Sequence, residues 1–369
     1  MQTIIKKTNI KYWLATNYLN GFGPVTIKKC ISHFGSIESF FLASKNNLTS
    51  IGLTQKRLDS IKKINWDFIE RDYNWCQTND CQILCLDDPL YPKILKEISD
   101  PPLMLFVKGD ANLLNMPQIS MIGSRNPSFS GKENAYKFAS QLSKSGVIIT
   151  SGLAIGIDTA SHKGALSSNC KTIAVLGSGL ANIYPLSNKN LACNIVKDGA
   201  LVSEFSPFET PKSHNFPRRN RLISGLSLGV LVVEAAIKSG SLITARFAIE
   251  QCREVFAIPG SINNALSRGC HNLIRQGAVL VETVDDILKE IDIRGDSLYF
   301  DQKPGGLKNI EKLDEKSLKL LKLVSEEVTS LDAIILNSGL TASEASSELL
   351  CLELQGCIKS VHGGYINLI

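Results

Sequence analysis

The sequence has no long apolar run. No stretch approaches the ~20 consecutive apolar residues that a bilayer-spanning helix needs, and the first residues show no apolar core followed by a small-residue cleavage site. We therefore expect no membrane insertion and a cytoplasmic location. The phosphate-binding pattern GxxxxGK[ST] is also absent, which excludes a P-loop for ATP chemistry.

Cysteine and histidine are present, but not at the spacing of metal sites. Cys76, Cys81 and Cys85 form the closest group among ten cysteines, and they lack the two-residue spacing and the nearby histidine that zinc sites favour. They are interpreted as buried free thiols in a reducing compartment. The five histidines show no metal-ligand spacing either, so we expect no metal and no cofactor.

Acidic residues are scarce in one part of the chain. The 369 residues carry a net charge of only +5, but residues 210–280 contain nine basic and three acidic side chains, an excess of six. Arg218, Arg219 and Arg221 lie there, directly behind Phe216. Such a concentration of positive charge favours a polyanionic partner.

The length exceeds one average domain, and the first segment, residues 1–85, shows short helical patterns. Gly21 and Gly23 precede Pro24 at a helix start. The pattern resembles a helix-hairpin-helix or SAM-like domain, and packing is favoured over DNA contact for it.

The central segment, residues 86–296, alternates apolar, β-branched runs with amphipathic stretches. Seven such runs are expected to be strands, beginning with "QISMIGSR" and ending with "GAVLV". Strands that alternate with helices indicate a parallel sheet covered on both faces. The fold class is therefore α/β, with an extended Rossmann-like, doubly wound, mostly parallel sheet.

The last segment follows a Gly/Pro-bearing linker at residues 297–308. Residues 309–369 show three helical patterns and a small hairpin, which is a winged-helix arrangement. Its third helix carries Glu344, Glu348 and Glu353 without Lys or Arg. Phosphate would repel that face, so protein contact or simple packing is favoured over insertion into a DNA groove.

Small and polar residues follow the expected strands, where ligands of parallel sheets bind. Gly123-Ser124-Arg125, Ser151-Gly152 and Gly177-Ser178-Gly179 each come after an apolar run. Such residues let an extended ligand approach the backbone and the amide groups of helix N-termini. Asp158 and His162 are interpreted as a helix N-cap and a polar contact in the groove rather than an acid/base pair. Since no catalytic set is evident, binding without turnover is expected.

The arginine segment allows two interpretations. A run of charges is by default a solvated face with one or two surface ion pairs. Phe216 beside Arg218, Arg219 and Arg221 is, however, the combination that single-stranded nucleic acid uses, with a ring for a base and guanidinium groups for phosphates. We favour the second reading, with Arg125 as a further clamp.

Several blocks carry a family resemblance, among them "MIGSRNPSFSG", "TSGLAIGIDTASHKGAL", "FPRRNRLISGLS" and "VVEAAIKSGSLITA". They resemble the DNA-processing protein A (DprA, also called Smf) family. The resemblance implies a non-enzymatic, single-stranded DNA-binding recombination mediator of natural transformation. Such proteins act in competence and DNA uptake, protect incoming single strands, help load the RecA recombinase and form homodimers. Dimers of the family would meet around Leu273–Val281.

The resemblance also implies a binding site for single-stranded DNA. Arg125, with Gly123 and Ser124, and Arg221, with Asn220, would hold phosphate, and Phe216 would stack on a base. The full expected set is Gly123, Ser124, Arg125, Gly152, Lys212, Phe216, Arg218, Asn220, Arg221, Lys238, Ser239, Gly240, Ser241 and Thr244.

Two other functions remain open at this point. A nucleotide-hydrolysing enzyme of the lysine-decarboxylase-like, phosphoribohydrolase group could use a similar groove. That group carries a Pro-Gly-Gly-x-Gly-Thr block with a glutamate shortly after it, whereas this chain has "AAIKSGSLITA" with Glu250 too far along. An adaptor that works through its acidic C-terminal helix could coexist with DNA binding.

Overall fold

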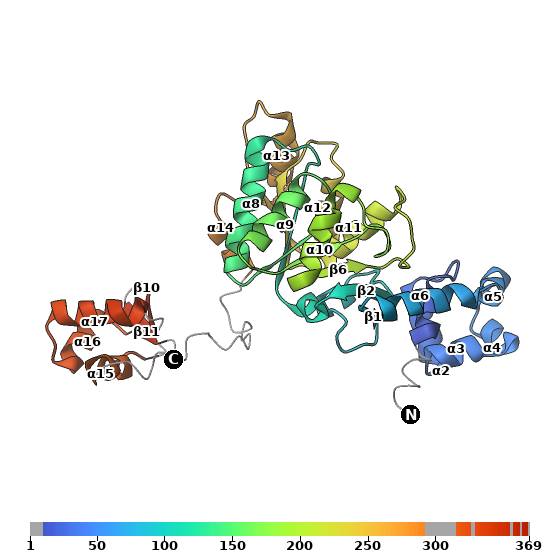
Figure 1. The fold of residues 1–369 in the computed structure, drawn as a ribbon, viewed down its shortest axis with the longest axis horizontal. Coiled ribbons are helices and arrows are strands. Elements are labelled where there is room, and N and C mark those ends of the chain that lie inside the picture. The colour runs from blue at the N-terminus through green and yellow to red at the C-terminus, as the bar shows by residue number, and fades with distance from the viewer. Residues whose placement is uncertain (1–9, 292–314, 326–328, 355–356, 362–363, 368–369) are drawn as a thin grey trace. The chain divides into compact units, whose positions relative to one another are not determined.

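The structure is a computed structural model that describes residues 10–291, 315–325, 329–354, 357–361 and 364–367. The chain forms two compact units, Met1–Asp292 and Ile293–Ile369 (Figure 1). The linker expected at residues 297–308 lies outside the described residues. Among the described helices, none is long and apolar enough to cross a membrane.

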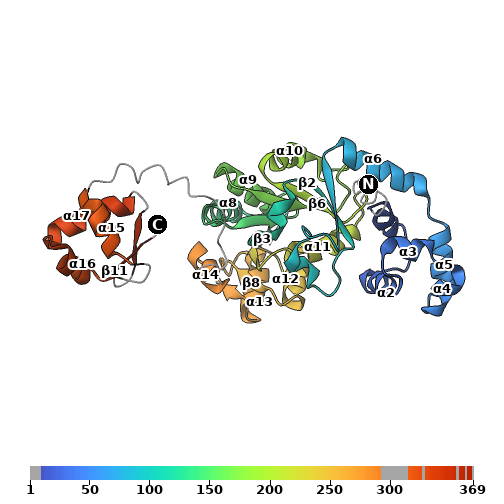
Figure 2. The same cartoon turned by 90° about the horizontal axis from the view of Figure 1, so that it is seen from below.

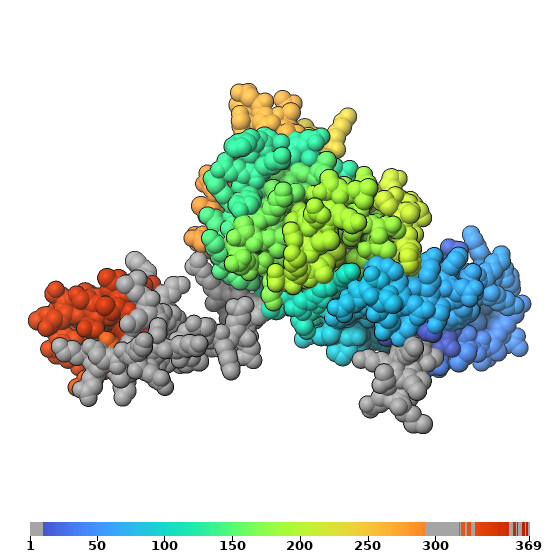
Figure 3. All heavy atoms as spheres, in the orientation of Figure 1, coloured from blue at the N-terminus to red at the C-terminus, as the bar shows by residue number. Residues whose placement is uncertain are grey.

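Short helices fill the first part of the larger unit. They are α2 (Pro24–Phe34), α3 (Ile37–Leu42), α4 (Lys45–Ser50), α5 (Gln55–Lys62) and α6 (Trp66–Thr78). Pro24 occupies the first position of α2, as expected, behind the N-cap Gly23. Ile27 and Phe40 are buried in the same apolar core as Phe106 of the sheet. In Figure 3 the blue atoms of this N-terminal part lie directly against the teal atoms that follow them in the chain.

One sheet holds nine of the described strands, in the order β1-β2-β6-β5-β4-β3-β7-β8-β9. They are β1 (Cys81–Cys85), β2 (Met104–Gly109), β3 (Gln118–Gly123), β4 (Ile148–Ser151), β5 (Thr172–Val175), β6 (Ala200–Ser203), β7 (Gly229–Glu234), β8 (Glu254–Ala257) and β9 (Val279–Leu280). The strands β3 to β9 are parallel to one another and coincide with the seven apolar runs, which confirms the expected fold class.

Two antiparallel strands extend the sheet beyond the sequence prediction. Strand β2 pairs antiparallel with β6, and β1 pairs antiparallel with β2. The expected boundary after Cys85 therefore falls between two hydrogen-bonded neighbours of one sheet. Strand β1 belongs structurally to the sheet, although it follows the N-terminal helices directly.

The chain winds in both directions from β3. It passes through β4, β5 and β6 on one side and then crosses back to β7, β8 and β9 on the other. Right-handed crossovers consequently place α8 (Phe129–Lys144), α9 (Ile157–Ser167) and α10 (Lys189–Asp198) on one face, and α11 (Asn215–Gly225) and α12 (Ser241–Glu250) on the other. Figure 2 shows the two layers. The switch between the two directions lies at β3, where such sheets bind ligands.

Shorter elements complete the larger unit. They are α7 (Lys93–Lys96), η1 (Ala111–Asn115), η2 (Leu186–Asn188), η3 (Ala265–Ser267), α13 (Arg268–Arg275) and α14 (Val284–Glu290).

The described residues of the smaller unit form three helices and a hairpin, as expected. It consists of α15 (Glu315–Leu323), α16 (Leu331–Ser338), α17 (Ala342–Leu354), β10 (Ile358–Val361) and β11 (Gly364–Asn367). The glutamates of α17 take part in the fold: Glu344 accepts hydrogen bonds from Thr341, Glu348 from Ser317 and Glu353 from the amide of Ser360. These bonds favour the packing interpretation of this acidic helix.

Candidate nucleic-acid interface

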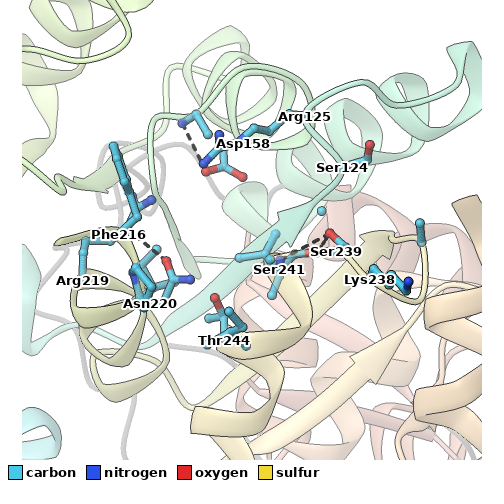
Figure 4. A pocket seen from close by; sticks show the side chains of 18 of the residues that line it. Ser124, Arg125, Asp158, Phe216, Arg219, Asn220, Lys238, Ser239, Ser241 and Thr244 are labelled. Carbon is cyan, nitrogen blue, oxygen red and sulfur yellow. Dashed lines mark hydrogen bonds between the residues drawn. The ribbon is translucent and has the colours of Figure 1, made fainter. Parts of the chain in front are cut away.

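A pocket of about 710 Å³ opens beyond the carboxyl ends of β4, β3 and β7, at the switch point of the sheet. Residues after each of these strands and one side of α11 line it. Figure 4 shows Phe216, Arg219 and Asn220 of α11 on one side, and Ser239 and Lys238 on the other. Ten of the fourteen expected binding residues are in this lining: Gly123, Ser124, Arg125, Phe216, Asn220, Lys238, Ser239, Gly240, Ser241 and Thr244.

The ring of Phe216 lies near a cation and a second ring. The Arg125 guanidinium lies 5.8 Å from its centroid, and the Tyr184 ring lies 5.7 Å away at 51°. A Cβ atom at Gly177 would come within 2.8 Å of the Phe216 ring, so the glycine that follows β5 makes room for the ring. Tyr184 was not among the expected residues. Its only sequence signal is the Tyr-Pro pair after the third parallel strand.

The exposed cations that line the pocket make no ion pair with a carboxylate in the described part of the chain. Arg125 and Lys238 are exposed, and neither forms an ion pair with any residue that the structure describes. In contrast, Lys212 pairs with Glu209 at 2.6 Å and Arg218 with Glu204 at 3.1 Å. Of these four, the two unneutralised cations are the ones that line the pocket.

Arg221, which was expected to hold phosphate, is buried in an internal ion pair. Its side chain is buried; Nη2 lies 2.5 Å from a Glu204 carboxylate oxygen, and Nη1 donates to the carbonyl of Asp100. Burial raises the pKa of Glu204, and the Arg221 guanidinium opposes that rise. Arg221 therefore neutralises an internal carboxylate and is not part of the pocket lining.

Arg219 forms part of the floor of the pocket. It is buried, and its Nη1 donates to the carbonyl oxygens of Gly152 and Val175, both at 2.6 Å. A Cβ atom at Gly152 would overlap this guanidinium. Gly152 is thus needed for the packing of Arg219 and does not line the pocket itself. Burial lowers the pKa of Arg219 to about 10, which leaves it charged at neutral pH.

Asp158 and His162 differ from their expected roles. The N-cap of α9 is Gly156, and the buried Asp158 carboxylate accepts hydrogen bonds from the amides of Gly152 and Ala154 at 3.1 and 3.2 Å. His162 is fully buried, with Nδ1 2.8 Å from the Thr172 hydroxyl, so it does not reach the groove. Burial lowers its pKa to about 3.

The helix N-termini around the pocket differ in the groups that accept hydrogen bonds from their amides. At the start of α8, the Glu234 carboxylate accepts hydrogen bonds from the amide and the hydroxyl of Ser128, both at 2.7 Å. At the start of α9, the Asp158 carboxylate accepts the hydrogen bonds from the amides of Gly152 and Ala154 in the preceding loop. Helix α12 begins after Gly240 without a side-chain cap, and this start lines the pocket. The amides of Ser241, Leu242 and Ile243 there donate to the Ser239 hydroxyl and to the carbonyls of Ser239 and Gly240. The exposed ammonium group of Lys238 beside this start is therefore the donor that an incoming anion can use.

Metal-ligand chemistry has no support in the described part of the chain. No three His, Cys, Asp or Glu side chains gather there as metal ligands. Cys76, Cys81 and Cys85 are buried and free, as expected, whereas Cys193 and Cys252 are free but exposed.

These features define the class of the protein: a Rossmann-like binding fold with an N-terminal helical segment and a C-terminal winged-helix unit. The chain belongs to the family described as DNA recombination-mediator protein A, whose sequence profile matches residues 82–292. A second profile, the DprA winged helix domain, matches residues 308–364.

Named relatives agree with this assignment. Protein Smf of Escherichia coli strain K12 is 42% identical over 331 residues, which is 87% of this chain and 86% of that protein. DNA processing protein DprA of Streptococcus pneumoniae is 48% identical over 205 residues, 56% of this chain and 72% of that protein.

Two solved structures are also similar. The X-ray structure of S. pneumoniae DprA has a TM-score of 0.67 at 37% identity and covers 76% of this chain and 96% of its own. A DNA processing protein A structure from Helicobacter pylori, described in terms of its single-stranded DNA binding mode, has a TM-score of 0.53 at 30% identity. It covers 58% of this chain and 98% of its own.

Proposed function

We propose that this chain binds single-stranded DNA in the switch-point pocket and acts as a recombination mediator in natural transformation. The observation that carries the proposal is that two cations without ion-pair partners, Arg125 and Lys238, line the same groove as the ring of Phe216. The single-stranded DNA binding described for the H. pylori relative supports it.

The geometry suits a strand whose bases are unstacked. Arg125 and Lys238 contact phosphates, and Phe216 offers a face to a base. A duplex keeps its bases stacked and cannot use the ring. Affinity therefore favours single strands, and it falls with salt because phosphate binding releases counterions.

The proposal includes no catalytic step. The Asp158 carboxylate at the pocket floor is occupied by two backbone amides, and Thr244 is buried. The phosphoribohydrolase group carries a glutamate shortly after its Pro-Gly-Gly-x-Gly-Thr block. In this chain the segment after β7 instead presents Lys238, Ser239 and Ser241 to the pocket. Base release from nucleoside monophosphates would revive the alternative.

Assembly is part of the same proposal. A cytoplasmic homodimer that loads RecA would use the open sheet edge around Leu273–Val281. Leu280 of the last strand is 45% exposed there. Apolar side chains at a free sheet edge favour pairing with a second copy.

A binding titration tests the function. We expect Arg125→Ala to weaken binding of a labelled oligothymidine by roughly 1–3 kcal/mol, the range for lost charge-assisted hydrogen bonds, without loss of folding. Arg246→Ala is the matched control, because Arg246 is exposed, carries the same charge and does not line the pocket. Equal affinities of wild type for single-stranded and duplex DNA, or equal losses in both variants, would refute the proposed site.

A further inference from the structure

A second pocket lies between α8 and α9, beside the first. Its volume is about 430 Å³, and its lining combines exposed apolar side chains with two lysines. Phe129 is 84% exposed, Tyr136 42% and Ile155 43%. Large apolar side chains gathered at one exposed place mark a binding surface more often than a solvated one.

The positive charge of this surface is not neutralised from within. Lys132 and Lys163 are exposed and make no ion pair in the described part of the chain. The one acid of the lining, Glu133, is paired with Lys137 at 2.7 Å. Two rings beside two free ammonium groups match a strand of bases and phosphates better than an apolar protein face.

The two pockets are lined by residues that are close in sequence. Asn126 lines the first pocket and Phe129 the second, and Ala154 and Ile155 are consecutive residues that line one pocket each. Three residues of chain span at most about 10 Å. A strand that leaves the first pocket past Arg125 therefore reaches the second within a few nucleotides.

The frame of the second pocket is rigid. Gly164 of α9 lies so close to α8 that a Cβ atom there would overlap the carbonyl of Tyr136. The side-chain amide of Asn188 donates to the Leu153 carbonyl and to the Thr159 hydroxyl, both at 2.8 Å. These contacts fix the loop that carries Ile155 against α9, so the surface is formed before a ligand arrives.

We propose that this surface is a second stacking subsite for the same strand, in which Phe129 and Tyr136 hold bases and Lys132 and Lys163 hold phosphates. The inference rests on the proposed function, since it extends the bound strand beyond the switch-point pocket. It predicts that the contribution of these residues depends on the length of the bound strand.

A length series of oligothymidines tests the subsite. Binding of wild type and of Phe129→Leu is measured by fluorescence anisotropy for strands from about 4 to about 16 nucleotides, the range of site sizes in single-strand binding folds. The variant is expected to bind the shortest strands like wild type and the longest about 5- to 150-fold more weakly, since a stacked base is lost. Phe129→Trp keeps a ring and is expected to bind like wild type.

The lysines give a second measurement. With long strands, Lys132→Ala combined with Lys163→Ala is expected to lower the slope of log affinity against log salt by about 1.4, or 0.7 for each lost phosphate contact. Lys144→Ala combined with Lys197→Ala is the matched control. Lys144 and Lys197 are exposed in the C-terminal turns of α8 and α10 and line neither pocket. Their replacement removes the same charge.

Each outcome decides the inference. Equal losses for short and long strands, or no loss for long strands, would overturn it. If Phe129→Leu left DNA binding intact and changed the oligomeric state in sedimentation, the surface would belong to a second copy of the chain. If wild type bound no strand of any length, the proposed function itself would fail, which is a distinct result.

Discussion

Replacing Arg221 by alanine should destabilise the fold rather than remove a DNA contact. The Arg221 guanidinium and the Glu204 carboxylate are both buried and lie 2.5 Å apart. Removal of one partner from a buried ion pair typically costs about 3–5 kcal/mol, because the other charge is left without compensation. Arg218 stays 3.1 Å from Glu204, so we expect the lower end of this range.

A loss of about 3 kcal/mol lowers the melting temperature of a unit of this size by roughly 5 °C. Thermal unfolding followed by circular dichroism measures it, with Arg125→Ala as the comparison that should melt like wild type. The double variant Arg221→Met with Glu204→Gln removes both buried charges and should recover most of the loss.

The loss should also depend on pH. Burial raises the folded pKa of Glu204, and Arg221 is the largest opposing influence, so in Arg221→Ala the folded pKa lies further above the unfolded value. Stability then falls as the pH rises through the folded pKa and is regained in acid, where the carboxyl is neutral. The difference from wild type should therefore be larger at pH 7 than at pH 5. A wild-type melting temperature together with a DNA affinity as weak as that of Arg125→Ala would refute this account.

Three further outcomes follow from the described contacts. Lys238→Ala should lower the salt slope of binding to single strands by about 0.7, measured by anisotropy at several salt concentrations. Gly177→Ala should displace the Phe216 ring, because the added methyl would lie 2.8 Å from it, and should weaken DNA binding as much as Phe216→Leu does, by about 1–3 kcal/mol. His162 is buried with a folded pKa of about 3, below its ordinary 6.5, so stability should fall as the pH drops from 6.5 toward 3. In urea titrations, the fall should exceed that of His162→Gln by up to about 1.4 kcal/mol per pH unit.

The parallel part of the fold could be predicted because each central strand is buried on both faces and reads as a continuous apolar run. Strands β1 and β2 were not predicted. Residues Cys81–Cys85 show no regular alternation of buried and exposed positions over their five residues, and they follow a helical segment without a clear break. A pattern that short does not separate a strand from the end of a helix.

The site was predicted where small residues and hydroxyls follow strands, since the topology alone brings those positions to one edge. The arginines of α11 are not gathered on the pocket, because successive residues of a helix point about 100° apart. Arg219 extends under the pocket, whereas Arg218 and Arg221, three positions apart, both reach the buried Glu204 carboxylate. The distance in sequence from Arg221 to Asp100 hides their pairing from any local pattern.

The carboxylates of Glu234 and Asp158 already satisfy the amides at the starts of α8 and α9. These two helix starts therefore keep their hydrogen bonds whether or not a strand is bound, and release of a strand leaves no unpaired amide at either of the cited bonds. Binding and release consequently require no rearrangement of the protein at these two places.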